Sequence, residues 1–170
     1  HLWTAPTYRM LADIFIPAWR GIVPSWLYTL NLSEMRIDFV NGSVIRLRSR
    51  EHPDRLRGPS YAGVFHDEVA MDRSRYAWDV VMANIRQQPG PQAGQLFCAT
   101  ITTPRLGWHQ LMVQGSDAPV VKWTSLDNPW ASATAIEQMR QQFGPAMFAQ
   151  EVLADWVAQA GRIWPSFSDE

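Results

Sequence analysis

The sequence predicts an α/β domain whose sheet is mostly parallel and carries helices on both faces. Strand-like apolar runs alternate with segments of helical periodicity along most of the chain, which is the pattern of such a sheet. One apolar run, residues 61–65, leads through His66 into the adjacent acids Asp67 and Glu68. Ligands bind beyond the carboxyl ends of the strands in sheets of this class, so we expect the functional site at this acidic strand end.

The composition fits a single intracellular domain. The chain has 170 residues, of which 46% are hydrophobic, enough for a sizeable core. A formal net charge of −1 gives no global indication of nucleic-acid binding, so such a role would depend on local basic patches. Lys122 is the only lysine among 15 basic residues, and arginine is the better residue for bidentate phosphate contacts. Cys98 is the only cysteine, which excludes a disulfide within the chain. Neither a bilayer-spanning apolar run nor a signal peptide is visible.

The first part of the chain predicts a strand, a helix and a hairpin. Residues 1–5 have the pattern of a short strand, and residues 8–19 have helical periodicity, although Pro17 argues against a regular last turn. Residues 21–24 are expected to form a connection. Residues 35–40 and 43–48 alternate between apolar and polar side chains on either side of Asn41-Gly42, which is a strong β-hairpin signal.

The middle of the chain predicts two strands that end at the same edge of the sheet. A polar, turn-rich segment at 51–60 leads into the acidic strand, and a helix is expected over residues 75–87. Residues 88–94 are rich in proline and glycine and predict a loop. The next strand, residues 95–101, ends at Thr102 and Thr103. Since parallel strands end at one edge, these threonines and the acids are expected to lie together.

The last part predicts shorter elements. A helix is expected at 108–114 and a further strand at 120–124, which Asp127-Asn128-Pro129 would end. Thr134 with Glu137 resembles a capping box, from which a helix would run to Phe143 and stop at Gly144. Pro145 is expected to open the next helix.

Asp67 and Glu68 are the candidate site residues. In nucleotide hydrolases one acid at a strand end holds Mg²⁺ and another group positions the attacking water. Neighbouring side chains on a strand point to opposite faces, so these two need a bend to meet at one ligand, or else they have different tasks. The alternative is a pair of exposed acids without a catalytic role. We expect a third acid, Asp72, to lie in a solvated loop.

Two groups of arginines are further candidates. Arg46, Arg48 and Arg50 alternate, so a strand would display all three on one face. That face either contacts a DNA backbone or, as we favour, is simply solvated. Arg57 either has a functional role or is tied to a nearby acid, Asp54 or Glu68. No spacing of the histidines is typical of metal ligands.

The ordered set of these features resembles the ATPase domain of the large terminase subunit of tailed phages, the motor that packages DNA into viral capsids. The resemblance covers nearly the whole chain. Its matching segments are Ala5-Pro6-Thr7, Asn41-Gly42-Ser43, Leu56-Arg57-Gly58, Val64-Phe65-His66-Asp67-Glu68, Thr102-Thr103-Pro104, Asp127-Asn128-Pro129, residues 148–151 and residues 161–164.

The resemblance implies a fold and roles for five residues. The fold is a P-loop NTPase core of the strand-inserted kind that helicases and terminases share. Asp67 would help to bind Mg²⁺·ATP, and Glu68 would be the catalytic carboxylate that orients or activates water. Arg57 would act as a finger on the nucleotide of a neighbouring subunit. Thr102 and Thr103 would sense the γ-phosphate and couple hydrolysis to movement.

The chain departs from the family in one respect. The phosphate-binding pattern Gly-x4-Gly-Lys-Ser/Thr is absent, and Lys122 lacks the neighbours that this pattern requires. In the family that loop precedes the strand on which this chain opens, and a nuclease domain follows. We therefore expect residues 1–155 to be a partial ATPase domain, incomplete at its N-terminus, and residues 156–170 to begin a linker toward a nuclease domain. We expect the isolated chain neither to bind ATP tightly nor to cut DNA.

The resemblance also implies partners and a location. These are double-stranded DNA, a portal protein, a small terminase subunit and a homo-oligomeric ring, without a membrane, in the cytoplasm of an infected bacterial cell. Three alternatives stay open from the residues alone. They are another helicase-like DNA-translocating ATPase, a carboxylate-metal nuclease that uses Asp67, Glu68 and Asp72, and a non-catalytic interaction module.

Overall fold

The computed structural model describes residues 1–85, 96–101, 106–117 and 119–157. The chain divides into two compact units, His1–Thr100 and Ile101–Glu170. The sheet and the acidic strand end belong to the first unit, and the second unit is helical in its described residues. The predicted loop at 88–94 and the residues Thr102 and Thr103 lie outside the described residues.

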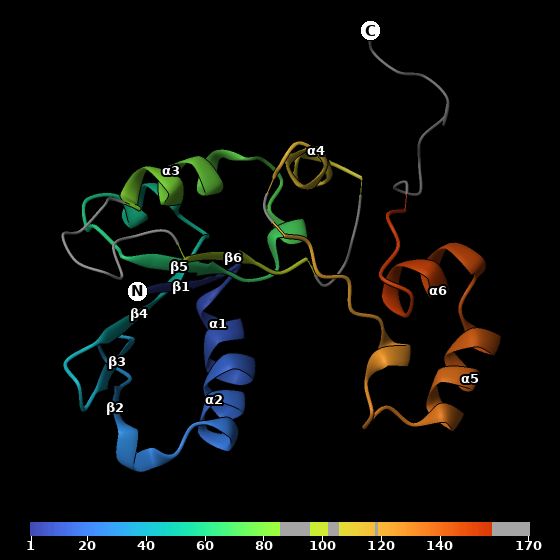
Figure 1. Ribbon diagram of the computed structural model, residues 1–170, viewed down its shortest axis with the longest axis horizontal. Helices are drawn as coiled ribbons and strands as arrows, with labels where there is room; N and C mark the ends of the chain where they lie inside the picture. Colours follow the sequence, from blue (N-terminus) through green and yellow to red (C-terminus); the bar gives the residue numbers. More distant parts are fainter. Residues whose placement is uncertain (86–95, 102–105, 118, 158–170) are drawn as a thin grey trace, which may run out of the picture. The chain divides into compact units, whose positions relative to one another are not determined.

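The first unit is built on a six-stranded sheet with the order β2-β3-β4-β1-β5-β6 (Figure 1). The strands are β1 (Leu2–Ala5), β2 (Tyr28–Asn31), β3 (Arg36–Phe39), β4 (Val44–Ser49), β5 (Gly63–His66) and β6 (Leu96–Ala99). Strands β4, β1, β5 and β6 run parallel, whereas β2 and β3 are antiparallel and form one edge. The predicted α/β class with a mostly parallel sheet is confirmed.

The predicted hairpin is present and is extended by a strand that the sequence analysis missed. Strands β3 and β4 are joined through Asn41-Gly42, where Gly42 has a φ of 82°. The side chain of Asn41 accepts a hydrogen bond from the Ser43 amide (2.9 Å) and closes the turn. Strand β2 pairs antiparallel with β3. Its four residues are too few to produce a clear alternation, so periodicity alone does not reveal it.

One helical segment covers the first face of the sheet and passes through a proline. It consists of α1 (Tyr8–Met10), the π-helical turn η1 (Leu11–Phe15) and α2 (Ile16–Ile22). Thr7 caps its start by accepting a hydrogen bond from the Met10 amide (3.1 Å). The expectation of an irregular end at Pro17 is wrong, because the helix continues to Ile22. Proline lacks an amide donor and crowds the preceding turn, and the wider π turn just before it relieves both constraints.

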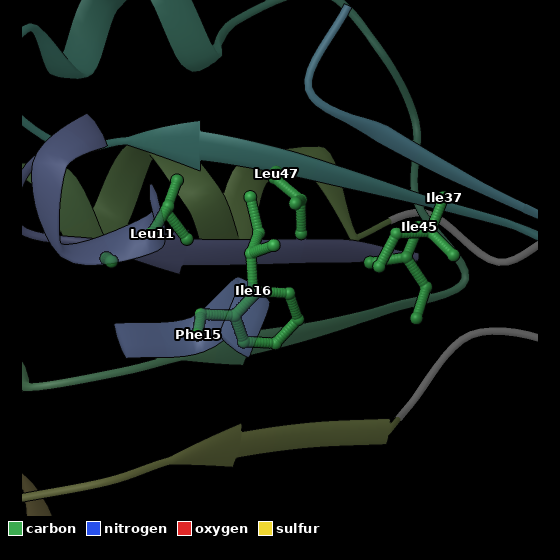
Figure 2. Packing of buried hydrophobic residues seen from close by; sticks show 7 residues of the cluster. Leu11, Phe15, Ile16, Ile37, Ile45 and Leu47 are labelled. Carbon is green, nitrogen blue, oxygen red and sulfur yellow. The ribbon is translucent and has the colours of Figure 1, made fainter. Parts of the chain in front are cut away.

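The side chains of this segment form a core with the sheet. In Figure 2 Leu11, Phe15 and Ile16 from the helix meet side chains of β3 and β4. The buried members of this cluster are Ala5, Leu11, Phe15, Ile16, Ile37, Ile45 and Leu47. Each large side chain that is fully buried here contributes about 1.5–3 kcal/mol relative to exposure.

Helix α3 (Tyr76–Asn84) covers the opposite face (Figure 1). It packs Val80 and Val81 onto Leu2 and Val64 of the sheet, together with Leu56 and Tyr61. The side chain amide of Asn84 donates to the Leu56 carbonyl oxygen and thereby ties α3 to the 3₁₀ turn η3 (Pro53–Leu56). Helices therefore lie on both faces of the sheet, as predicted.

The second unit contains the helices α4 (Trp108–Gln114), α5 (Ala133–Gln142) and α6 (Pro145–Glu151). The predicted strand at 120–124 is wrong. Residues 120–123 have no regular structure there, and Val121 and Trp123 are exposed. An apolar run becomes a strand only where another strand pairs with it, and the described part of this unit offers none.

The capping expected for α5 is shifted along the chain. Its N-cap is Ser132, whose hydroxyl accepts a hydrogen bond from the Ala135 amide (3.3 Å), and not Thr134. A capping box does occur, between Thr124 and Asp127 at the 3₁₀ turn η5 (Ser125–Asp127). Helix α6 opens with Pro145, as predicted. Among the residues described, no helix is both long and apolar enough to span a bilayer.

Candidate functional site

Strand β5 ends at His66, and the chain then turns sharply. The Asp67 amide still donates to the Thr4 carbonyl oxygen of β1 (2.9 Å). Glu68 has φ 54° and ψ 47°, which is the left-handed region. For a residue with a Cβ this conformation costs about 1–2 kcal/mol. The chain therefore bends at Glu68, directly after the strand end, as one of the two possibilities considered from the sequence requires.

Thr100 clamps this turn from the end of β6. Strands β5 and β6 are parallel and place His66 beside Ala99, so the residues after each strand emerge next to one another. The Thr100 hydroxyl donates to Asp67 Oδ1 and accepts from the Glu68 amide (3.1 Å). The Thr100 carbonyl oxygen also accepts from the Val69 amide (2.9 Å). Thr100 was not among the site residues expected from the sequence, although its place directly after the strand was the available signal.

The carboxylate of Glu68 has one oxygen, Oε2, that is buried and has no hydrogen-bond partner in the described part of the chain. Burial of an unpaired polar oxygen is costly, and such atoms in native proteins call for an explanation. A group that is held ready for a ligand or a water molecule at this edge of the sheet provides one. This atom is the strongest indication that the acidic strand end is a functional site.

Arg50 and Asp72, which were both expected in solvated positions, form a buried ion pair next to the turn. Arg50 directly follows β4 and is only 5% exposed. Its Nε donates to both carboxylate oxygens of Asp72 (3.0 and 2.9 Å). Its Nη1 donates to Thr4 Oγ1 (3.3 Å) and its Nη2 to the Glu68 carbonyl oxygen (3.1 Å). Arg50 is therefore not on a solvated or DNA-facing surface, and Asp72 is not in a solvated loop.

His66 completes this network from β5. It is 1% exposed, with Nδ1 3.2 Å from Thr4 Oγ1 and Nε2 3.2 Å from Asp72 Oδ2. Burial lowers the pKa of His66, and the positive charge of Arg50 acts in the same direction, while the hydrogen bond to Asp72 opposes both. The ring is therefore neutral at neutral pH. Since both ring nitrogens are engaged, His66 does not serve as a metal ligand.

The donor set fits a metal ion that is bound together with a phosphate. No group of three or more histidine, cysteine, aspartate or glutamate residues in the described ranges is placed to hold a metal ion. Asp72 faces the guanidinium of Arg50, which leaves Asp67 and Glu68 as carboxylates at the edge. Mg²⁺ typically takes one or two protein carboxylates and completes its shell with substrate phosphates and water. The arrangement argues against a nuclease that uses Asp72 as a third metal ligand.

The side chain of Arg57 bonds to Asp54 and Tyr76 rather than to Asp67 or Glu68. Its Nε donates to Asp54 Oδ1 (3.0 Å) and its Nη2 to the Tyr76 hydroxyl (2.9 Å). The hydrogen bond from Tyr76 and then that from Arg57 lower the pKa of Asp54. The Arg57 side chain is 54% exposed, so its guanidinium lies at the surface of the first unit. Of the two acids considered from the sequence, Asp54 is the partner of Arg57.

Arg46 and Arg48 share a face, as the alternation predicts. Both line an open depression of about 730 Å³ together with Tyr8, Ser33 and Glu34. The Nη1 of Arg48 donates to three backbone carbonyl oxygens, those of Glu34, Met35 and Leu47. Arg48 therefore supports the start of β3 in addition to carrying charge. Thr102 and Thr103 lie outside the described residues, so their expected roles stay predictions.

Comparison with known proteins identifies similar chains. The model of the family described as "Terminase large subunit, T4likevirus-type, N-terminal" matches residues 20–168. The large terminase subunit of Escherichia phage T5 is 32% identical over 175 residues, which cover 96% of this chain and 39% of the phage protein. The chain thus spans well under half the length of this curated relative.

Solved structures show the same fold at lower identity. The large terminase of a thermophilic bacteriophage, solved in complex with ADP, superposes with a TM-score of 0.71 at 17% identity, over 92% of this chain and 40% of that one. The ATPase domain of the large terminase of Thermus phage P74-26 gives a TM-score of 0.59 at 18% identity, over 92% of this chain and 76% of that domain. The predicted P-loop NTPase architecture of the terminase type is confirmed.

Proposed function

The chain belongs to the terminase large subunit family, and from this premise we propose that it forms part of the ATPase of a viral DNA-packaging motor. The reaction is the attack of water on the γ-phosphate of ATP, and its energy drives double-stranded DNA into a capsid. The observation that carries this proposal is the turn at Asp67 and Glu68. It ends a buried strand of the sheet, is clamped by Thr100, and contains a buried carboxylate oxygen without a partner in the described part of the chain.

The two acids take different tasks in this proposal. Glu68 orients the attacking water and accepts its proton, for which its buried, unengaged oxygen is suited. Asp67 is held by the Thr100 hydroxyl and, with the nucleotide phosphates, would hold Mg²⁺. When bound, Mg²⁺ neutralises charge on the phosphate oxygens. Because Glu68 leaves the strand conformation that Asp67 still follows, the two acids would be free to take these separate tasks.

We further propose that the nucleotide site is completed by a phosphate-binding loop in a longer large subunit. The relative from the thermophilic bacteriophage was solved in complex with ADP, and this chain spans 40% of that protein. In this scheme residues 1–155 are a partial ATPase domain and residues 156–170 lead toward a nuclease domain. The threonines Thr102 and Thr103, two and three residues beyond the clamp at Thr100, would report the state of the γ-phosphate.

Arg57 is proposed to act on the nucleotide of a neighbouring subunit in a homo-oligomeric ring. It lies on the exposed segment before β5 and keeps more than half of its side chain in solvent. Its bonds to Asp54 and Tyr76 orient the guanidinium without burying it. A portal protein and a small terminase subunit are the other proposed partners, in the cytoplasm of the infected bacterial cell.

The role of Glu68 is tested by Glu68→Gln in the full-length large subunit that carries this segment. We expect ATP turnover to fall by about 10²–10⁴-fold, because the amide cannot accept the proton of the attacking water. The affinity for ATP, measured by calorimetry, should stay within about threefold of the wild type, which is about 0.65 kcal/mol. The matched control is Asp79→Asn on the exposed face of α3, where the acid pairs with Arg75. Turnover near the wild-type rate in Glu68→Gln would refute the assignment.

The proposed role of Arg57 in trans is tested by mixing two inactive variants. Arg57→Ala subunits keep their own Glu68 but lack the finger, whereas Glu68→Gln subunits keep the finger. If the arginine acts across a subunit boundary, mixed rings regain turnover above that of either variant alone, because some sites receive both groups. A mixture no more active than its components would show that Arg57 does not act on a neighbouring site.

A further inference from the structure

The conformation of Glu68 needs an explanation beyond the catalytic role of its carboxylate. A glutamate with backbone angles in the left-handed region is strained, and this conformation persists only where the surrounding structure holds it. Thr100 fixes the amide side of the residue (3.1 Å). On the carbonyl side the Glu68 oxygen accepts from the Met71 amide (3.0 Å) within the turn, and from Arg50 Nη2 (3.1 Å). Arg50 is thus the side chain that holds the carbonyl group of Glu68.

The geometry of Arg50 fits the task of holding the Glu68 carbonyl oxygen in place. All three of its guanidinium nitrogens are engaged, with Asp72, with Thr4 of β1 and with the Glu68 carbonyl oxygen. The planar fork of arginine reaches three directions at once, which the single ammonium group of lysine does not reproduce. The side chain of Arg50 is 1% exposed and that of Asp72 is 10% exposed. Neither residue is therefore positioned to contact a nucleotide directly.

The pair is also connected to the strand from which the acids emerge. Asp72 Oδ2 receives both Arg50 Nε (2.9 Å) and His66 Nε2 (3.2 Å), and Asp72 closes the 3₁₀ turn η4 (Val69–Met71) that follows Glu68. The segment from His66 to Asp72 is thus fixed at both ends and in its middle by the same ion pair. A rigid turn of this kind determines where the Glu68 carboxylate points.

We propose that Arg50, held by Asp72, is a positioning residue that keeps Glu68 in its left-handed conformation and so sets the direction of its carboxylate. The catalytic consequence rests on the proposed ATPase function, whereas the conformational consequence does not. A misplacement of a reacting group by about 1 Å can cost about 10²-fold in rate. Removal of the Arg50 contact is therefore expected to slow the catalytic step rather than to weaken nucleotide binding.

The first experiment uses Arg50→Lys in the full-length large subunit. Lysine keeps the positive charge beside Asp72 but loses the bond to the Glu68 carbonyl oxygen. We expect kcat to fall by about 10- to 100-fold while KM for ATP changes by no more than about twofold. The control is Arg75→Lys, which alters an arginine that also pairs with an aspartate, but on the surface. In the Glu68→Gln background Arg50→Lys should cause no further loss, because the two residues act as a unit.

The second experiment reads the backbone and does not depend on ATP turnover. Hydrogen exchange of the amides of Glu68, Val69 and Met71 should accelerate at least about tenfold in Arg50→Lys, with the amides of α3 unchanged. If the wild-type protein does not hydrolyse ATP, the proposed function fails, and this measurement alone decides the positioning role. Unchanged exchange in this turn overturns the proposal, as does an unchanged kcat in an active protein.

A double variant separates positioning from general stability. Arg50→Met with Asp72→Asn removes both charges and keeps an acceptor for His66, so no buried charge is left unpaired. We expect its urea midpoint to stay close to that of the wild type and its exchange and kcat defects to match those of Arg50→Lys. Recovery of a wild-type kcat in this variant would show that Arg50 serves stability alone and would overturn the proposal. Faster hydrogen exchange of amides throughout the sheet of the double variant, and not only in this turn, would also overturn the proposal.

Discussion

The left-handed conformation of Glu68 predicts an inverted ranking of alanine and glycine at this position. In most helices and strands glycine is less stable than alanine, because it loses more backbone freedom on folding. Glu68 has φ 54° and ψ 47°, where a Cβ atom is strained and glycine is not. Glu68→Ala and Glu68→Gly both remove the carboxylate with its buried oxygen. The difference in stability between these two variants therefore reports the strain in the backbone, less the effect of the greater freedom of glycine in the unfolded chain.

The magnitude follows from two opposing effects. The left-handed conformation costs about 1–2 kcal/mol for a residue with a Cβ atom. The greater freedom of glycine in the unfolded chain offsets about 0.5–1 kcal/mol of this. Glu68→Gly should thus unfold with a free energy about 0.5–1 kcal/mol higher than that of Glu68→Ala. In a chain of this size the corresponding difference in melting temperature is about 1–4 °C.

The measurement is urea denaturation of the two variants, followed by circular dichroism. The control is Ala18→Gly on the exposed side of α2, where helical geometry holds and glycine should cost about 1 kcal/mol. The sign of the glycine effect should therefore differ between the two positions. A Glu68→Ala variant as stable as Glu68→Gly, or more stable, would refute the argument that the turn stores strain.

Three further predictions concern the first unit, each measured by urea denaturation. Burial lowers the pKa of His66 below the value of about 6.5 expected in the unfolded chain. As the pH falls, the unfolded chain therefore binds a proton at this residue before the folded protein does. The free energy of unfolding should thus decrease as the pH drops below about 6.5. His66→Gln should reduce this slope, and an identical slope in the variant would contradict the assignment. Leu47→Ala, at a fully buried position, should cost about 2–5 kcal/mol, and a loss below about 1 kcal/mol would show that the core is not packed as described. Gly42→Ala, at φ 82°, should cost about 1 kcal/mol or more, and no loss would mean that the hairpin turn tolerates a Cβ.

Except for β2, the strands of the sheet were predictable because their signals are local. Asn41-Gly42 between two alternating runs predicts the β3–β4 hairpin without any knowledge of the fold. The apolar run before Asp67 predicts β5, and both acids lie at the strand end as expected. The predicted strand at 120–124 shows the converse. Its apolar run is real, but whether a partner strand is available depends on the whole fold and not on the run.

The environment of the site was much less predictable than the two acids themselves. Arg50 continues the alternation of Arg46 and Arg48, so periodicity assigned it to the same face. Arg50 is buried because it forms an ion pair with Asp72. This pair joins the residue after β4 to the turn after β5, so it exists only once both have taken their places in the fold. The contact of Thr100 with Asp67 likewise depends on the register of β5 against β6. Such pairings join distant parts of the chain, and a single sequence contains no direct signal for them.

The place of β1 in the sheet has a consequence for how the protein folds during synthesis. Strands β2, β3 and β4 follow one another and pair antiparallel, so this meander can form early from neighbouring residues. Strand β1 precedes them but pairs with β4 and β5, and its second neighbour, β5, is complete only once residue 66 has been synthesised. Until then β1 is an apolar segment with an open edge, a period in which chaperones can capture the nascent chain. The network around Thr4 joins β1, the residue after β4 and the end of β5, so we expect the acidic turn to be among the last parts of this unit to be ordered.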